Sequence, residues 1–307
     1  MSPALRRVLA GAVLVATAIA LAGRWGDLRE GARGLHAGPV AAALALAAAG
    51  TAATMLAWRA VLADLGSPLR TRPAARFFFV AQLGKYLPGG VWPFLTHMEL
   101  GRELRLPRHR TATALALTLG LSLLTALLVA AATLSLVGGD RARDYAPLLL
   151  AVPVLALSLR PRTVQRVLDW TLRRLGRESL ERVPTWRGVL SAAGWLVAAW
   201  ALYGAHTWVL ARHLGGTADE LPALGTGAFA LSWALGLIVV FAPAGVGVRE
   251  AVLVALLSAS LGSAGATTLA VASRLLLVAA DVLCAGVATL TAVGAGDRLR
   301  PRGAPRP

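Results

Sequence analysis

Long apolar runs, separated by short polar and basic connections, make up most of the chain. A bilayer crossing needs about 20 mostly apolar residues in a helix, because all backbone polar groups must be satisfied within the segment. The pattern therefore predicts an all-α, polytopic membrane helix bundle with eight transmembrane helices. The predicted spans cover residues 8–22, 39–62, 111–137, 145–159, 188–210, 221–241, 246–261 and 267–294.

The basic residues between these runs predict the topology, because short cytoplasmic connections hold an excess of Lys and Arg. Arginines concentrate in segments 59–110 and 160–187 and in a basic tail, 298–307. The connections around Arg141 and Arg212 are nearly neutral. This alternation places both termini in the cytoplasm. The first run also ends in a sequence that resembles a signal-peptide cleavage site, and cleavage would leave the remaining topology unchanged.

Two connections differ from simple loops. In segment 160–187, apolar residues recur at helical spacing and arginines occupy other faces, which predicts an amphipathic helix on the inner leaflet; a solvated basic linker is the alternative. Segment 73–101 is too polar and too interrupted for one lipid-facing helix, yet too apolar for an aqueous loop. Since basic residues flank both of its ends, we expect a re-entrant hairpin that protein shields from lipid.

Composition narrows the class of protein further. Of the 307 residues, 57% are hydrophobic and 15% charged, which excludes a soluble enzyme. We expect one transmembrane domain over residues 1–297 and no aqueous domain of ordinary size. The net charge of +16 matches basic connections that contact anionic lipid, so nucleic acid is not an expected partner. The single cysteine, Cys284, lies in an apolar run and predicts neither a disulfide framework nor a thiolate metal site.

The first candidate site is the break in the re-entrant segment. Lys85, the only lysine of the chain, and Tyr86 precede Pro88, Gly89 and Gly90. Pro removes a backbone donor and Gly permits unusual backbone angles, so backbone groups next to a cation become available to a polar ligand such as phosphate. Broken helices of this kind form substrate sites in transporters. We expect a lipid headgroup to bind here; the alternative is a structural turn whose lysine extends to the membrane interface.

The second candidate site is a similar break nearer the C-terminus. Pro243, Gly245 and Gly247 interrupt the apolar sequence, and Arg249 and Glu250 follow directly. Ionisable residues inside a membrane cost about 2.5 to 3.5 kcal/mol each on insertion scales, which makes them candidates for a function. The alternative is a helix cap in which Glu250 stabilises the positive end of the helix.

Two more charged residues lie inside the last apolar run. Arg274 and Asp281 are seven residues apart and share one helix face, about 10 Å apart along the axis. We therefore expect each of them to meet a partner from another segment, and Glu250 is the hypothetical partner of Arg274. Both are candidate substrate contacts in a lipid pathway; the alternative is a structural clasp between helices.

Other polar and aromatic residues are weaker candidates. His97 and Glu99 lie near the end of the re-entrant segment, where an interfacial position is the alternative to a site role. Four residues are interpreted as packing residues: His206, Trp195, Trp200 and Trp233.

Motifs for catalysis are scarce. The sequence has no His/Cys metal spacing, no Gly-x-Ser-x-Gly elbow and no phosphate-binding Gly-Lys-Ser/Thr loop. We therefore expect no enzymatic activity, no cofactor and no metal site. Two alternatives stay open: a membrane-embedded transferase that uses Asp27 and Glu30, and a membrane subunit without activity of its own.

The two broken segments resemble the signature segments of a known family. Residues 84–92 read Gly-Lys-Tyr-Leu-Pro-Gly-Gly-Val-Trp, and residues 242–251 read Ala-Pro-Ala-Gly-Val-Gly-Val-Arg-Glu-Ala. Both are similar to segments of the lysylphosphatidylglycerol synthase transmembrane family, a group of flippase-like integral membrane proteins. The resemblance covers most of the chain, residues 8–294.

This resemblance implies a function. The membrane region of that family is taken to move an aminoacylated phospholipid, or another lipid-linked headgroup, between leaflets, and fused members carry a soluble transferase domain after it. The resemblance implies the transport module alone, in the bacterial inner membrane, with substrate contacts at the motif residues of both breaks. The expected partners are a phospholipid or lipid-linked substrate, the membrane and, as an open alternative, a second copy of the chain.

Overall fold

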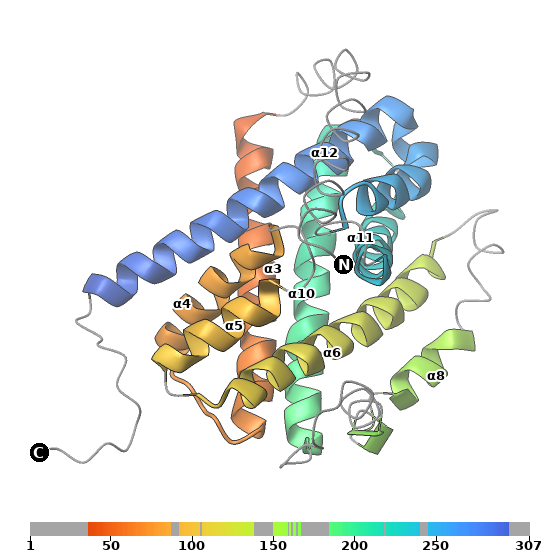
Figure 1. Ribbon diagram of the computed structural model, residues 1–307. Helices are drawn as coiled ribbons and strands as arrows, with labels where there is room; N and C mark the ends of the chain where they lie inside the picture. Colours follow the sequence, from red (N-terminus) through yellow and green to blue (C-terminus); the bar gives the residue numbers. More distant parts are fainter. Residues whose placement is uncertain are drawn as a thin grey trace, which may run out of the picture.

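The protein is all-helical wherever its computed structural model describes the chain. The described residues are 36–86, 92–104, 106–137, 150–158, 160, 162–163, 165–166, 184–217, 219–239 and 245–294. The long helices are α3 (Ala37–Asp64), α6 (Arg108–Leu134), α10 (Trp186–His213), α11 (Leu221–Ile238) and α12 (Val248–Gly294) (Figure 1). The shorter elements are α4 (Thr71–Gln82), the 3-10 helix η1 (Leu83–Tyr86), α5 (Trp92–Glu103) and α8 (Ala151–Ser158).

Five helices of the described part are long and apolar enough to cross a bilayer: α3, α6, α10, α11 and α12. They cover the predicted spans from 39–62 onward, except 145–159, of which the structure describes little more than α8. The predicted span 8–22, most of the amphipathic segment 160–187 and the tail 298–307 lie outside the described residues. The chain is therefore an all-α membrane helix bundle, as predicted, while the count of eight transmembrane helices stays a prediction.

α12 is a hairpin of two arms. Gly262 has φ 71° and ψ 166°, which is a conformation almost restricted to Gly, and it separates the arms. Glu250 and Arg274 lie 12 residues before and after Gly262, or about 18 Å along each arm, yet their side chains are 3.6 Å apart. The arms must therefore run back alongside each other, and they match the two separate spans predicted for 246–261 and 267–294.

Contacts at the two ends of α10 show which segments share an end of the bundle. The carboxylate of Asp64, the last residue of α3, accepts hydrogen bonds from the backbone N–H (2.7 Å) and the hydroxyl (2.6 Å) of Thr185, just before α10. Beyond the other end of α10, Gly216 packs against Leu261, because a Cβ added to Gly216 would lie 2.9 Å from that side chain. Both contacts join segments that the topology prediction places on a common side of the membrane.

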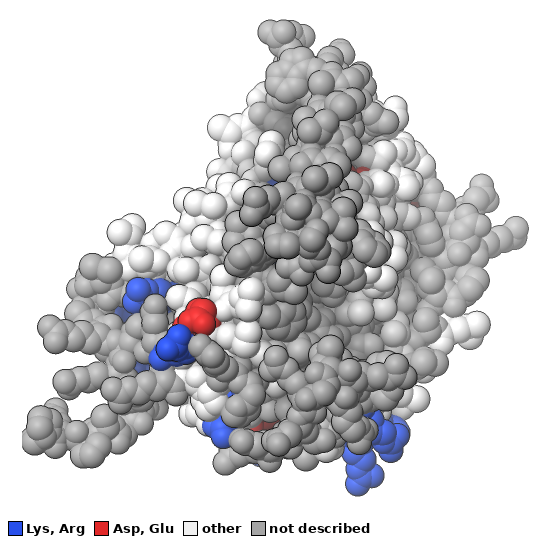
Figure 2. All heavy atoms as spheres, in the orientation of Figure 1, with Lys and Arg blue, Asp and Glu red and all other residues white. Residues whose placement is uncertain are grey.

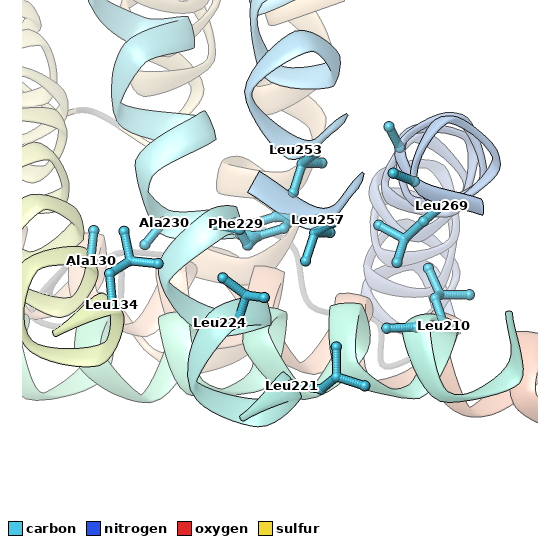
Figure 3. Close-up of a cluster of buried hydrophobic side chains, with 14 of the residues drawn as sticks. Ala130, Leu134, Leu210, Leu221, Leu224, Phe229, Ala230, Leu253, Leu257 and Leu269 are labelled. Carbon is cyan, nitrogen blue, oxygen red and sulfur yellow. The ribbon is translucent and has the colours of Figure 1, made fainter. Parts of the chain in front are cut away.

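Two clusters of buried side chains hold the bundle together. In the first, Trp58 of α3 stacks on Phe77 of α4 with ring centroids 5.0 Å apart, and His97 of α5 meets both rings edge-on. The second cluster joins α6, α10, α11 and both arms of α12, and Figure 3 shows Leu224 and Leu257 within it. The first cluster anchors the interrupted segment to α3, and the second anchors the α12 hairpin to the rest of the bundle.

The segment predicted to be re-entrant consists of short helices. α4 and η1 precede the break and α5 follows it, and the hydroxyl of Thr96 in α5 donates a hydrogen bond to the carbonyl of Ala81 in α4 at 3.0 Å. Residues 87–91, between them, lie outside the described residues. No single long helix fills the described part of this segment, and α4 and α5 pack against each other. The re-entrant path itself stays a prediction.

Much of the described surface is uncharged. On the face shown in Figure 2, charged side chains gather mainly in the lower half, and most other described atoms belong to uncharged residues. The second arm of α12 exposes a row of large apolar side chains: Leu275, Val282, Val287 and Leu290. Such a row is unfavourable in water but favourable next to lipid tails. The charged residues of the same arm therefore face protein.

Candidate functional site

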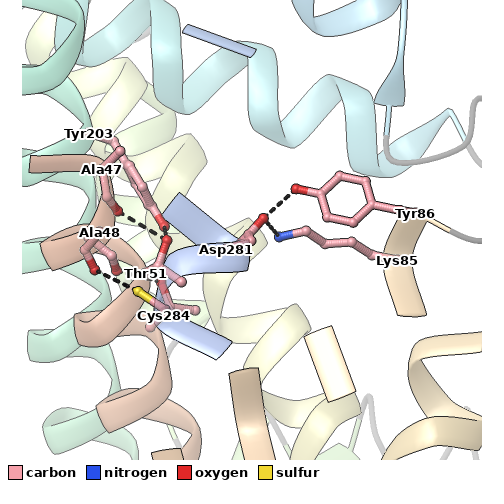
Figure 4. Close-up of polar contacts among 10 residues, drawn as sticks. Ala47, Ala48, Thr51, Lys85, Tyr86, Tyr203, Asp281 and Cys284 are labelled. Atoms are coloured by element: carbon pink, nitrogen blue, oxygen red, sulfur yellow. Dashed lines mark hydrogen bonds and ion pairs between the residues drawn. The ribbon is translucent and has the colours of Figure 1, made fainter. Parts of the chain in front are cut away.

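Lys85 and Tyr86, the described residues of the first candidate site, contact Asp281 of α12. Lys85 Nζ lies 2.7 Å from Oδ2 of Asp281, and the hydroxyl of Tyr86 donates a hydrogen bond to the same oxygen (Figure 4). The side chain of Asp281 is only 4% exposed, whereas that of Lys85 is 32% exposed. A buried carboxylate needs such partners, because desolvation of an unpaired charge costs several kcal/mol. The positive charge of Lys85 is thus matched by Asp281.

The short turn of η1 explains how both partners reach one oxygen. Lys85 and Tyr86 are consecutive, and the chain leaves α4 through η1 where α4 packs on α12. The hydroxyl of Tyr86 donates to the Asp281 carboxylate from the position next to Lys85. Because Glu250 and Arg274 also belong to α12, both candidate sites meet the same helix.

Further polar groups lie on the other side of Asp281, on α3, α10 and α12. The hydroxyls of Thr51 and Tyr203 are 3.2 Å apart, and Sγ of Cys284 lies 3.9 Å from the carbonyl oxygen of Ala48 (Figure 4). The sequence does not point to Thr51 or Tyr203, because single Thr and Tyr residues in apolar helices carry no motif, and for Cys284 it shows only an apolar environment. They extend the polar environment of Asp281 into the bundle.

Glu250, in the second candidate site, has two partners. Its Oε2 accepts a hydrogen bond from the backbone N–H of Gly247 at 2.7 Å, which caps the start of α12. Its Oε1 lies 3.6 Å from Nε of Arg274. The predicted pairing with Arg274 is confirmed, and the helix cap that was the alternative for Glu250 is present as well.

Arg249 occupies a slot between two glycines. A Cβ on Gly236 of α11 would lie 2.6 Å from Cγ of Arg249, and a Cβ on Gly245 would lie 2.8 Å from its Nε. Cζ of the guanidinium lies 5.8 Å from the centre of the Trp233 ring, within the range of a cation–π contact. Its Nε is buried and has no hydrogen-bond acceptor among the described residues. The glycines thus make room for a positive charge.

A small pocket lies beside this slot, between α11 and the two arms of α12. It has room for about one water molecule. Its polar lining comes from six residues: Ser232, Trp233, Arg249, Glu250, Ser273 and Arg274. With two arginines and one glutamate, the described lining carries a net positive charge.

The remaining candidates have varied positions. Arg274 and Asp281 each meet a partner from another segment, as predicted. His97 is fully buried among aromatic rings, whereas Glu99 forms a surface ion pair with Arg102 at 3.2 Å. Six candidates lie outside the described residues: Pro88, Gly89, Gly90, Pro243, Asp27 and Glu30.

His206, interpreted as a packing residue, also forms two hydrogen bonds. Its Nδ1 lies 2.8 Å from the carbonyl oxygen of Ala43 in α3, and its Nε2 lies 2.9 Å from Oγ of Ser273 in α12. Trp233 was likewise interpreted as packing only, yet it lines the pocket of Arg249. The spacing of Trp233 and Gly236, which places both on one helix face, is a signal that could have identified this face of α11.

Comparison of the whole sequence with known protein families gives a match. Residues 8–285 match the family described as lysylphosphatidylglycerol synthase TM region. The chain belongs to this family. The matched range includes both candidate sites, from Lys85 to Asp281. No curated protein matches the chain. This member of the family is a membrane-spanning protein with several apolar helices.

Proposed function

We propose that this protein moves a phospholipid or another lipid-linked headgroup between the leaflets of the bacterial plasma membrane. The observation that carries the proposal is the convergence of both interrupted segments on the second arm of α12. Lys85 from the first segment pairs with Asp281, and Glu250 from the second pairs with Arg274. An apolar bundle has no structural need for two charge pairs on one helix, since hydrophobic side chains of similar size are often equally stable there.

The depth of these pairs along α12 supports the proposal. Asp281 lies 19 residues beyond Gly262, or about 28 Å, whereas Arg274 lies about 18 Å beyond it. The hydrocarbon core of a bilayer is about 30 Å thick. If Gly262 lies near one surface, the Glu250–Arg274 pair is near the middle and the Lys85–Asp281 pair near the opposite surface. The two ion pairs then form successive binding positions for a charged headgroup.

Such binding positions lower the free-energy cost of moving a charged headgroup through hydrocarbon. A phosphate can replace a carboxylate as the partner of a cation, and an amine can replace Lys85 as the partner of Asp281, so no charge is left unpaired during the exchange. The acyl chains would remain in lipid beside the exposed apolar row of α12. Because the sequence has no ATP-binding loop, the lipid gradient or the membrane potential would drive the movement.

The proposal includes a topology. Segment 73–101 enters the membrane and returns to the cytoplasmic side, and both termini are cytoplasmic. The shared ends of α3 and α10 and the approach of Gly216 to Leu261 support the relative arrangement. The arginine-rich connections 59–110 and 160–187 support the direction.

Leaflet exchange in liposomes tests this function. The purified chain is reconstituted with headgroup-labelled phospholipids, and a membrane-impermeant quencher reports how fast the label moves between leaflets. We expect exchange faster than in protein-free vesicles, and at least about tenfold slower exchange for Lys85→Ala, which corresponds to about 1.4 kcal/mol. Arg102→Ala, which removes an exposed cation of the same hairpin, serves as the matched control and should exchange like the wild type. Wild-type exchange no faster than in empty vesicles, for every lipid tried, would contradict the proposal.

A further inference from the structure

We infer that the pocket of Arg249 and Arg274 is a binding site for a phosphate group. The inference rests on the proposed function for the source of that phosphate, and it deepens the function by naming the part of the lipid that the second site holds. The sequence alone predicts Lys85 and the adjacent Pro-Gly-Gly break as the phosphate ligand. The contacts of the described residues move this role to the arginines.

The charged side chains of the two candidate sites differ in whether a carboxylate neutralises them. Lys85 is held at 2.7 Å by a buried carboxylate, so its charge is already matched. Glu250 is the one carboxylate in the described lining of the pocket, and its two oxygens contact Gly247 and Arg274. Arg249 therefore has no carboxylate of its own among these residues. An anion that enters here would find positive charge in excess.

The side chain of Arg249 is held in place by its neighbours. Gly236 and Gly245 pack against Cγ and Nε of its side chain, and Trp233 covers the guanidinium. A side chain held in this way loses little conformational freedom when it binds. Its buried Nε still lacks an acceptor among the described residues, and phosphate oxygens fit the planar donor fork of Arg. The slot thus presents a fixed guanidinium to a ligand.

The position of the second arginine indicates where the ligand enters. The side chains of Arg274 and Glu250 are 18% and 23% exposed, so the pocket opens at this pair. At 3.6 Å their contact is longer than a strong charged hydrogen bond, and a phosphate at the mouth can displace Glu250 from Arg274. The start of α12, two residues before Glu250, adds a favourable dipole. The phosphate would bind at the mouth, because the interior has room for only about one water molecule.

The test is a titration of the purified full chain in detergent micelles, followed by the midpoint of thermal unfolding, which rises with ligand occupancy. The probes are phosphatidylglycerol, an uncharged diacyl glycolipid without phosphate, and inorganic phosphate. The variants are Arg249→Gln, Arg249→Lys and Gly236→Ala, which displaces Arg249 but keeps its charge. The controls are Arg187→Gln, an exposed arginine at the start of α10, and Gly194→Ala, a helical glycine with open space around it.

We expect phosphatidylglycerol to stabilise the wild type more than the glycolipid does. Arg249→Gln and Gly236→Ala should weaken its apparent affinity at least about tenfold, Arg249→Lys should weaken it less, and both controls should bind like the wild type. Stabilisation by inorganic phosphate as well indicates a site open to free phosphate; stabilisation by the lipid alone indicates a lipid phosphate. If both Arg249→Gln and Gly236→Ala bind phosphatidylglycerol as tightly as the wild type, the inference is wrong. If Arg249→Gln does not fold, Gly236→Ala decides alone.

This binding test is separate from the exchange assay. If the variants lose binding and the wild type shows no leaflet exchange, the inferred phosphate site is supported and the proposed transport is refuted. Exchange by the wild type, together with unchanged binding in the variants, would refute the site and retain the transport.

Discussion

The two interrupted segments are alike in sequence and different in electrostatic environment. Each combines Gly and Pro with a cation, yet Lys85 pairs with a buried carboxylate from α12, whereas Arg249 lies between glycines under an aromatic ring. The carboxylate next to Arg249 in sequence, Glu250, turns instead to the backbone of its own helix and to Arg274. A charge beside a helix break therefore does not identify the ligand site. The partner that the fold supplies to that charge decides whether it is available.

The same contrast extends to three ion pairs that differ in burial. Lys85–Asp281 includes a 4% exposed carboxylate, Glu250–Arg274 is partly exposed on both sides, and both members of Glu99–Arg102 are 62% exposed. Desolvation and screening predict that the effect of breaking a pair should follow this order. Three variants, one for each ion pair, test that order. A fourth variant tests the α12 hairpin, which brings Glu250 and Arg274 together.

The largest effect is expected for Lys85→Ala. The variant leaves the Asp281 carboxylate buried with Tyr86 as its described partner, which should lower the free energy of unfolding by about 3 kcal/mol. Unfolding with denaturing detergent, followed by circular dichroism, measures the loss. The double variant Lys85→Ala/Asp281→Ala should recover at least about 1 kcal/mol, because it removes the unpaired charge. Equal stability of the single and double variants would show that the pair does not join the first segment to α12.

Gly262→Ala should have the next largest effect. The backbone at Gly262, with φ 71° and ψ 166°, lies in a region almost restricted to Gly, so a Cβ should cost about 2 kcal/mol even though open space surrounds it. Gly286→Ala, in a helical and equally open position of the same arm, is the control and should be neutral or slightly stabilising. Spin-label distances between the two arms should change in Gly262→Ala alone. An unchanged stability and arm distance would mean that the hairpin does not depend on this glycine.

A smaller effect is expected for Glu250→Ala. The variant removes the cap on the Gly247 N–H and the partly exposed contact with Arg274, for a total of about 1 to 2 kcal/mol. Glu250→Gln keeps a carbonyl acceptor for the cap and should lose less than half of that amount. Thermal unfolding of the two variants side by side separates cap from ion pair. Equal losses would assign the whole effect to the charge.

The smallest effect is expected for Arg102→Ala. Its pair with Glu99 is exposed on both sides, so the free energy of unfolding should change by less than about 0.5 kcal/mol. Raising the salt concentration should remove even this difference. A loss as large as that of Lys85→Ala would overturn the argument that burial ranks the three pairs.

Several features could be predicted from the sequence because their causes are local. The apolar runs predicted the long helices, and the polar residues of segment 73–101 predicted that no single long helix fills it, as the short α4 and α5 show. Helical spacing placed Arg274 and Asp281 on one face and required partners from elsewhere, which the structure supplies. The choice of Lys85 as the partner of Asp281 was missed, as was the contribution of Trp233 and Gly236. Both depend on how α4, α11 and α12 pack, and no spacing within one helix contains that information.

The sequence by itself determined that the chain is a bundle of apolar helices with few charges, since a bilayer forces each segment to satisfy its backbone internally and to place apolar side chains outward. Only the tertiary structure decided which charges neutralise one another. Tyr86 and Asp281 share a hydrogen bond across 195 positions of chain, while Arg249 and Glu250 are adjacent and turn to different partners. The physical reason is that electrostatic energy depends on separation in space and on burial, and both are properties of helix packing.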